Sequence, residues 1–262
     1  MKNILVIGDV VGRCGRDILC EKLKEIQEEY EIDFTVVNGE NATTGNGINE
    51  KYATLLLEWG ADVITLGNHS FDKKDIEHLM DTDNRVIRPL NLSPDLPGDG
   101  VTVIEKDGVN YAVINLIGQV FIEKESTSPF DALKKAVENV KRRYDNPVII
   151  VDFHAEATSE KQALAYHLEG EITAIYGTHT HVQTNDARIL SEKTGYITDI
   201  GMTGSLDSVI GLEKEIGVGR FVGGEKKVFR WGETAPMING AVFTIDENTA
   251  ETKKIKLISK KY

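Results

Sequence analysis

The sequence of 262 residues predicts a single domain of the mixed α/β class. Three observations lead to this prediction. From the N-terminus, apolar runs rich in β-branched residues alternate with helical periodicity, as in parallel strands joined by helical crossovers. Later segments place turn residues between alternating runs, which is typical of hairpins. No internal repeat, low-complexity tract or Pro/Gly/Ser-rich linker divides the chain, so residues 1–262 are assigned to one domain.

The N-terminal part has the order βαβαβ. Residues 2–8 (KNILVIG), 34–38 (FTVVN) and 61–66 (ADVITL) are short apolar runs that predict buried strands. Residues 18–30 and 50–59 carry apolar side chains at helical spacing, which predicts the two crossover helices.

The remaining elements include at least one hairpin. Residues 101–116 contain Lys106-Asp107-Gly108 between two alternating runs, the signal of a tight antiparallel turn. We expect helices at 130–144 and 159–168, strands at 147–153, 172–176 and 195–199, and a closing hairpin formed by 241–245 and 252–258.

Composition excludes some classes of partner. The net charge of −12 opposes tight binding to long nucleic acids, whose phosphates would be repelled. No apolar run approaches the roughly 18 residues that span a membrane, and Asp9 ends the first run too early for a signal peptide. Cys14 and Cys20 are expected to be free thiols on one helix, which fits a reducing compartment. We therefore expect a cytoplasmic protein without membrane contact, and homo-oligomerisation remains open.

Metal-capable side chains follow five of the predicted strands. In open α/β sheets, ligands bind beyond the carboxyl ends of the strands, so these side chains can meet in one crevice. They are Asp9, Glu40, Asn41, Asn68, His154, His179 and His181.

Mixed nitrogen and oxygen ligands suit Mn, Fe(II) or Zn better than Mg or Ca. Seven ligands exceed the needs of one tetrahedral ion and suit two ions that share a carboxylate. Residues i and i+2 of an extended chain point to the same side, so the stretch GTHTH can present His179 and His181 as parallel imidazoles, one to each ion.

Each of these residues has a simpler explanation when it is taken alone. An isolated Asn after a strand is usually a turn former, and an isolated buried His is usually a hydrogen-bonded core residue. The joint pattern favours metal binding, because packing does not explain converging His, Asp and Glu groups. His78 and His167 fall within predicted helices among charged neighbours and are interpreted as surface residues. The fingerprints of a Rossmann loop, a P-loop and a nucleophile elbow are absent.

Several stretches resemble the calcineurin-like metallophosphoesterases, and within them the YmdB-type phosphodiesterases. The shared stretches are GDVVGR, NGENA, GNHSFDKK, RPLN, FHAEATSEK, GTHTHVQT and YITDIGMTG. This resemblance implies a four-layer αββα sandwich with mixed sheets and a dinuclear metal site. It also implies hydrolysis of small phosphodiesters, with 2′,3′-cyclic nucleotides as expected substrates and 3′,5′-cyclic nucleotides as further candidates.

The resemblance also implies how the ligands are shared between two divalent ions, for which Fe and Mn are favoured and Zn is an alternative. Two ligand sets follow, with Glu40 in both: Asp9, Glu40, Asn41 and His181 for one ion, and Glu40, Asn68, His154 and His179 for the other. The wider superfamily has D-x-H at the first motif, whereas this chain has Asp9-Val10-Val11, and Asn41 is expected to replace the missing histidine.

The expected mechanism is attack on phosphorus by a hydroxide that bridges the two ions. His69 follows the ligand Asn68, so we assign it as the general acid for the leaving oxygen, with Asp72 orienting it. Arg13 is a weak candidate for binding phosphate at a helix N-terminus. Two alternatives remain: a phosphomonoesterase or nucleotidase that uses the same site, and a regulatory metal- or nucleotide-binding protein.

Overall fold

The computed structural model describes residues 1–223 and 228–262. The described residues form two large mixed sheets and a separate two-stranded one. In chain order the elements are β1 (Lys2–Ile7), β2 (Asp9–Val10), α1 (Gly12–Glu29), β3 (Phe34–Asn38), α2 (Glu50–Glu58), β4 (Val63–Thr65), α3 (Ile76–Thr82), β5 (Val86–Ile87), β6 (Val101–Lys106), β7 (Val109–Ile117), α4 (Pro129–Arg143), β8 (Val148–His154), α5 (Thr158–His167), β9 (Ala174–Thr178), β10 (Arg188–Leu190), β11 (Thr194–Ile197), β12 (Met202–Ser205), β13 (Ser208–Val209), β14 (Leu212–Glu213), α6 (Lys214–Gly219), β15 (Pro236–Asp246) and β16 (Glu251–Lys261).

The first sheet contains the predicted βαβαβ unit. Its strand order is β2-β12-β15-β1-β3-β4-β5, with β16 also paired to β15. Strands β1, β3, β4 and β5 run parallel. The closing hairpin, β15 and β16, joins this sheet through an antiparallel pairing of β15 with β1. The prediction of a mixed α/β fold is confirmed.

The second sheet has the order β10-β11-β9-β8-β7-β6. Strands β7, β8, β9 and β11 are parallel, and the edge strands β6 and β10 are antiparallel to their neighbours. The predicted hairpin at Lys106-Asp107-Gly108 joins β6 to β7, with Asp107 and Gly108 both at positive φ.

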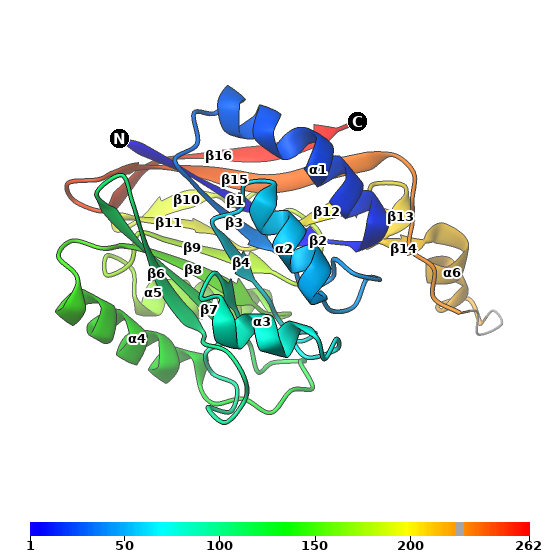
Figure 1. Cartoon of the computed structure of the whole chain (residues 1–262), viewed down its shortest axis with the longest axis horizontal. Helices are drawn as coiled ribbons and strands as arrows, with labels where there is room; N and C mark the ends of the chain where they lie inside the picture. The colour runs from blue at the N-terminus through cyan, green and yellow to red at the C-terminus, as the bar shows by residue number, and fades with distance from the viewer. Residues whose placement is uncertain (224–227) are drawn as a thin grey trace.

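The apolar side chains form clusters on both faces of the sheets. Because alternate residues of a strand face opposite sides, Leu5 and Ile7 of β1 pack in the cluster that includes α1 and α2, while Ile4 and Val6 face the second sheet. Between the sheets, the rings of Phe34 and Tyr111 stack at a centroid distance of 4.2 Å. Figure 1 shows α1 and α2 on one side of the strands and α4 on the other.

Helix α1 begins at Gly12, earlier than the predicted start at residue 18. Gly12 has a φ of +60°, which allows the chain to turn directly from β2 into the helix. Both cysteines lie on this helix as free thiols, as predicted. Among the described residues, the structure contains no helix with the length and apolarity needed to cross a membrane.

Candidate metal centre

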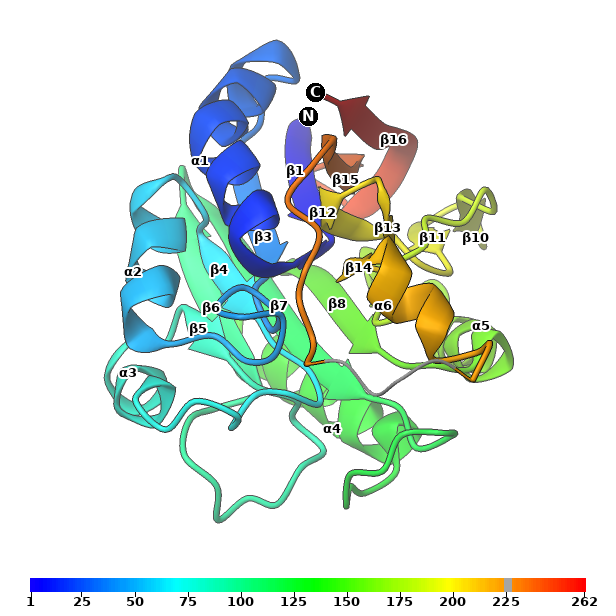
Figure 2. The ribbon, with the colours of Figure 1, turned by 90° about the vertical axis from the view of Figure 1, so that its right-hand side faces the viewer.

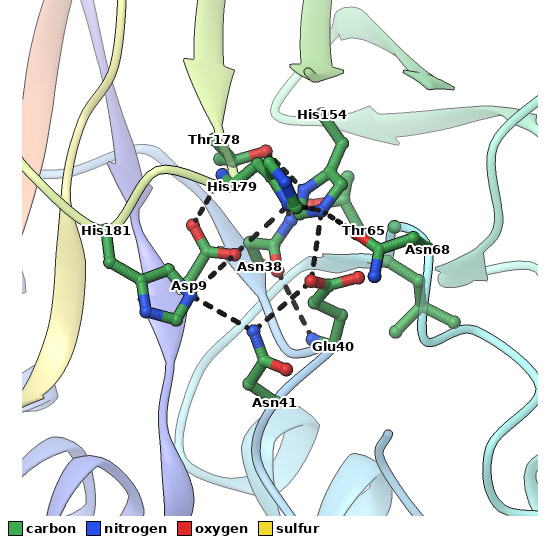
Figure 3. A network of polar contacts seen from close by, with 12 residues as sticks. Asp9, Asn38, Glu40, Asn41, Thr65, Asn68, His154, Thr178, His179 and His181 are labelled. Carbon is green, nitrogen blue, oxygen red and sulfur yellow. Dashed lines mark hydrogen bonds and ion pairs between the residues drawn. The ribbon is translucent and has the colours of Figure 1, made fainter. Parts of the chain in front are cut away.

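The seven predicted ligands lie together where strands β1, β3, β4, β8 and β9 end (Figure 3). Parallel strands place their carboxyl ends at one edge of a sheet, and the two packed sheets bring two such edges together. Figure 2 shows this end of the molecule with α6, β13 and β14 beside it.

Glu40, His154 and His179 form the tightest group. One ligand atom from each lies within 4.8 Å of the others. Nε2 of His154 is 3.0 Å from Oε1 of Glu40 and 3.0 Å from Nδ1 of His179. The side-chain oxygen of Asn68 lies 2.9 Å from the same His154 nitrogen. These four residues are the set expected for one ion.

A hydrogen-bond chain orients His154. The hydroxyl of Thr178 donates to Oδ1 of Asp152 at 2.7 Å, so it can only accept from Nδ1 of His154, which lies 2.9 Å away. The proton of the neutral ring therefore sits on Nδ1. The lone pair of Nε2 then points towards Glu40 and Asn68, as a metal ligand requires.

His179 is oriented in the opposite sense. Its Nε2 lies 3.2 Å from a carboxylate oxygen of Glu156, which can only accept a proton, so the free lone pair is on Nδ1. Unshared electron pairs of Glu40, Asn68, His154 and His179 thus face one point. Electron pairs this close repel each other unless a cation or a proton lies between them.

The second expected set surrounds Asp9. Oδ1 of Asp9 is buried and has no hydrogen-bond partner among residues 1–223 and 228–262. Nε2 of His181 lies 3.8 Å from this oxygen, and its Nδ1 donates to the carbonyl of Ile210 at 2.8 Å. A buried carboxylate oxygen without a donor is costly unless a cation neutralises it, so these residues fit a second ion.

Asn41 is the exception in this set. Its amide nitrogen, rather than its oxygen, lies 3.2 Å from Oε1 of Glu40 and 3.2 Å from Nε2 of His181. The amide must rotate by half a turn to offer oxygen to a metal ion.

The acids and bases of the site perturb each other strongly. Burial alone would raise the pKa of Glu40, but the imidazole of His154 holds it at about 2. Burial alone would lower the pKa of His154, but Glu40 and Asp9 raise it to about 9. Burial and the charge of His154 lower the pKa of His179 to about 3. Burial raises the pKa of Asp9.

The site leaves no room for a side chain at Gly67, the residue before the ligand Asn68. A Cβ atom at Gly67 would lie 2.2 Å from Oε2 of Glu40 and 2.5 Å from Nε2 of His154. Any side chain at position 67 would therefore collide with two of the ligands, so only glycine fits there.

Comparison with known proteins identifies the family. The family model described as YmdB-like protein matches residues 5–258. The chain belongs to the YmdB-like family.

Individual relatives of this YmdB-like chain agree with the family match. It is 43% identical over 256 residues to the 2′,3′-cyclic-nucleotide 2′-phosphodiesterase of Bacillus subtilis (strain 168), covering 98% of this chain and 96% of that protein. A phosphatase crystal structure from Mycoplasma pneumoniae superposes with a TM-score of 0.91 at 35% identity, covering 99% of this chain and 93% of that one. A Staphylococcus aureus structure described as a 5′-nucleotidase has a TM-score of 0.63 at 16% identity, covering 98% of this chain and 53% of that one, and shows the fold alone.

The GTHTH loop of the YmdB-like chain differs from the extended geometry that we expected. Strand β9 ends at Thr178, and His179 and His181 have φ angles of +98° and +64°. The loop bends because Asp199 accepts hydrogen bonds from both the backbone and the hydroxyl of Thr180. The prediction that GTHTH is extended chain is wrong, although both rings reach the site.

His69 and Arg13 lie in different cavities. His69 lines the cavity of the metal ligands, and its Nδ1 is 2.7 Å from Oδ2 of Asp72. Arg13 pairs with Asp17 at 3.1 Å and lines a neighbouring cavity instead. The described residues that line the first cavity therefore do not include Arg13.

Several residues of the site were not predicted from the sequence, among them Glu156, Arg220, Phe229 and Trp231. Glu156 orients His179, and its signal was present in the stretch FHAEATSEK, two residues after His154. Arg220, at the end of α6, and Phe229 and Trp231, which lie in an irregular segment, line the cavity of the metal ligands.

Proposed function

We propose that this YmdB-like chain is a metal-dependent phosphodiesterase acting on small phosphodiesters, with 2′,3′-cyclic nucleotides as its preferred substrates and 3′,5′-cyclic nucleotides as further candidates. The observation that carries the proposal is the convergence of unshared electron pairs at Glu40, Asn68, His154 and His179 beside a separately oriented His69. The activities named for the relatives support it, since they are phosphoric ester hydrolases.

Two divalent ions are proposed, held by the two ligand sets that share Glu40. Mixed imidazole, carboxylate and amide ligands favour Fe or Mn, with Zn as an alternative. When bound, such ions supply an activated water and neutralise phosphate oxygens. The unpartnered oxygen of Asp9 supports the second of the two ions.

The side chains then have distinct roles. Asp72 accepts a hydrogen bond from Nδ1 of His69, so Nε2 is the ring atom left to serve the substrate. A protonated His69 delivers its proton to the leaving oxygen of the ribose. The backbone N–H of His69 donates to Oε2 of Glu40 at 3.2 Å, which links the acid to the shared ligand.

A phosphomonoesterase activity on the same site is the second candidate, supported by the 35% identical phosphatase structure. A monoester carries more negative charge than a diester and needs more cations in its site. Arg220 is the one Lys or Arg among the described residues that line the cavity, which favours diesters.

We also propose that residues 1–262 form one domain with the four-layer αββα arrangement. Three apolar clusters support it: one between α1, α2 and the first sheet, one between the two sheets, and one between the second sheet and α4 and α5.

The proposal is tested by hydrolysis of bis-p-nitrophenyl phosphate and p-nitrophenyl phosphate with Mn(II), followed by 2′,3′-cyclic AMP. The diester should be preferred, and Glu40→Gln should lose more than the roughly 10–100-fold typical of an outer-sphere metal partner. Glu138→Gln, an exposed glutamate on α4, is the matched control and should behave as wild type. Preference for the monoester would favour a phosphatase. Metal binding without hydrolysis of any ester would favour a regulatory binding protein.

A further inference from the structure

The cavity of the metal ligands has two walls of different chemistry. Its volume is about 360 Å³, within the roughly 300–1,000 Å³ typical of small-molecule sites. One wall carries the ligands Glu40, Asn41, His179 and His181 together with His69. The other wall includes Ile210, Leu212, Arg220, Phe229 and Trp231. A ligand that fills the cavity would be polar at one end and apolar at the other.

Trp231 is the rigid part of the second wall. Its indole packs so closely on Gly45 that a Cβ atom there would lie 1.7 Å from the ring. An antiparallel β-bridge with Leu212 also holds the backbone of Trp231. These two contacts hold Trp231 in place beside the metal ligands.

Phe229 lies two residues earlier and is exposed. Its relative exposure is 53%, so the ring has free surface that a ligand can cover. The guanidinium carbon of Arg220 lies over the ring, 5.0 Å from its centroid. Within residues 1–223 and 228–262, no carboxylate lies close enough to Arg220 to form an ion pair.

Arg220 carries a positive charge in a cavity whose other charged side chains are mostly acidic. The chain has a net charge of −12, and Glu40, Glu156 and Arg220 are the charged carboxylate and guanidinium groups of the lining. Among the described residues of the lining, Arg220 is the one Lys or Arg, so it can attract a phosphodiester without a metal ion.

We propose that Arg220, Phe229 and Trp231 form the nucleoside-binding wall of the site, in which the Phe229 ring stacks on the nucleobase and Arg220 attracts the phosphodiester. The inference rests on the proposed function and names the side chains, outside the metal ligands, that contact the base and the phosphodiester. A purine or pyrimidine offers the flat face that an exposed aromatic ring requires, and stacking tolerates every base. The wall therefore selects nucleotides over simple alkyl phosphodiesters without selecting one base.

The test compares two five-membered cyclic phosphodiesters, one that carries a nucleoside with a base to stack and one that carries neither ribose nor base. Steady-state kinetics are measured with 2′,3′-cyclic AMP and with glycerol 1,2-cyclic phosphate. Phe229→Ala should raise KM for cyclic AMP by about 10-fold, with kcat and the KM of the base-free substrate unchanged. Phe229→Tyr should restore the wild-type KM. Phe221→Ala is the matched control, because Phe221 is 85% exposed on the same segment but does not line the cavity.

Arg220 is tested in the same assays. Arg220→Gln should raise KM for both substrates, since both carry the phosphodiester anion. Lys214→Gln is its control, because Lys214 is an exposed cation paired with Asp207 at 2.7 Å and lies outside this cavity.

A binding measurement gives a readout besides activity. The chain has two tryptophans, so a Trp59→Phe background leaves Trp231 as the sole indole reporter. Adenosine 3′-monophosphate should change the fluorescence of Trp231 without added metal, and Phe229→Ala should weaken this binding by a similar factor to the rise in KM.

Each outcome separates this inference from the proposed function. Hydrolysis of both substrates with equal KM, or no specific effect of Phe229→Ala, would refute the nucleoside-binding wall but not the proposed phosphodiesterase activity. No hydrolysis of any cyclic phosphate overturns the proposed function and the wall with it. Equal defects in Phe221→Ala and Phe229→Ala, with a concentration-dependent change in mass, would instead assign these side chains to an interface between copies of this chain.

Discussion

Nε2 of His154 lies 3.0 Å from Nδ1 of His179, and the other nitrogen of each ring already has a partner. Two ring nitrogens at this distance must share either a proton or a metal ion. The carboxylates around His154 overcome its burial and raise its pKa to about 9, while burial and His154 lower the pKa of His179 to about 3. In the metal-free protein, the shared proton therefore belongs to His154.

Metal binding should release this proton. Because His154 is protonated below pH 9 in the metal-free protein, an ion that takes its Nε2 must displace a proton. The apparent affinity for Mn(II) should rise by about tenfold per pH unit between pH 6.5 and 8. Titration calorimetry in buffers of different ionisation enthalpy should detect at least about one proton released per His154 site occupied. An affinity independent of pH over this range would contradict the assignment of His154 as a ligand.

Thr178→Val should weaken metal binding, although it removes none of the side chains that bind the metal. The variant keeps the shape of the side chain but removes the hydroxyl that accepts from His154 and donates to Asp152. Loss of such an orienting partner typically costs 10–100-fold in metal affinity. The matched control is Thr102→Val, another buried threonine, whose hydroxyl has no hydrogen-bond partner in the described part of the chain. Equal Mn(II) affinities for the two variants would show that the hydrogen-bond chain does not orient His154.

His69→Ala should slow hydrolysis while leaving the metal content unchanged. The expected loss on 2′,3′-cyclic AMP is about 10²–10⁴-fold, the usual contribution of a general acid. The loss should be much smaller on bis-p-nitrophenyl phosphate, since p-nitrophenolate leaves without a proton. His78→Ala, an exposed histidine on α3, controls for removal of an imidazole elsewhere. An equal loss on both substrates would show that His69 is not the general acid.

The sequence predicted which residues lie together in the site better than it predicted the backbone conformation that brings them there. The order βαβαβ places the ends of β1, β3 and β4 at one edge, so Asp9, Glu40 and Asn68 could be grouped from strand positions alone. The bend at His179 could not be predicted in this way, because it depends on Asp199, which lies twenty residues later in the chain. A local pattern carries no information about a hydrogen bond made by a distant residue.

The same limit applies to the wall opposite the metal ligands. Phe229 and Trp231 lie in an irregular segment, where neither a period of two nor one of 3.6 marks the side of each residue. Their place in the cavity follows from the tertiary contact of Trp231 with Gly45, far away in the sequence. Arg13, by contrast, was near the expected site in sequence, but its side chain pairs with Asp17 on α1.

Lys161→Met should destabilise the fold by removing the partner of a buried carboxylate. The Lys161 ammonium lies 2.7 Å from Oδ2 of Asp199 and 2.9 Å from the carbonyl of Thr178, and its side chain is 1% exposed. Breaking a buried pair from one side typically costs about 3–5 kcal/mol in the free energy of unfolding. Urea denaturation in the presence of a chelator measures this cost without a contribution from bound metal.

Two further variants separate the buried pair from a general effect of losing a lysine. Adding Asp199→Asn to Lys161→Met should recover part of the lost stability, because no charge is then left buried. Lys141→Met removes an exposed partner of Glu171 and should cost no more than about 1 kcal/mol. If the double variant is no more stable than Lys161→Met, the lysine acts through packing alone. The Mn(II) affinity of the double variant gives a second readout. If stability recovers but Mn(II) binding is weak, the hydrogen bonds from Thr180 to Asp199 position His179 and His181, which flank Thr180.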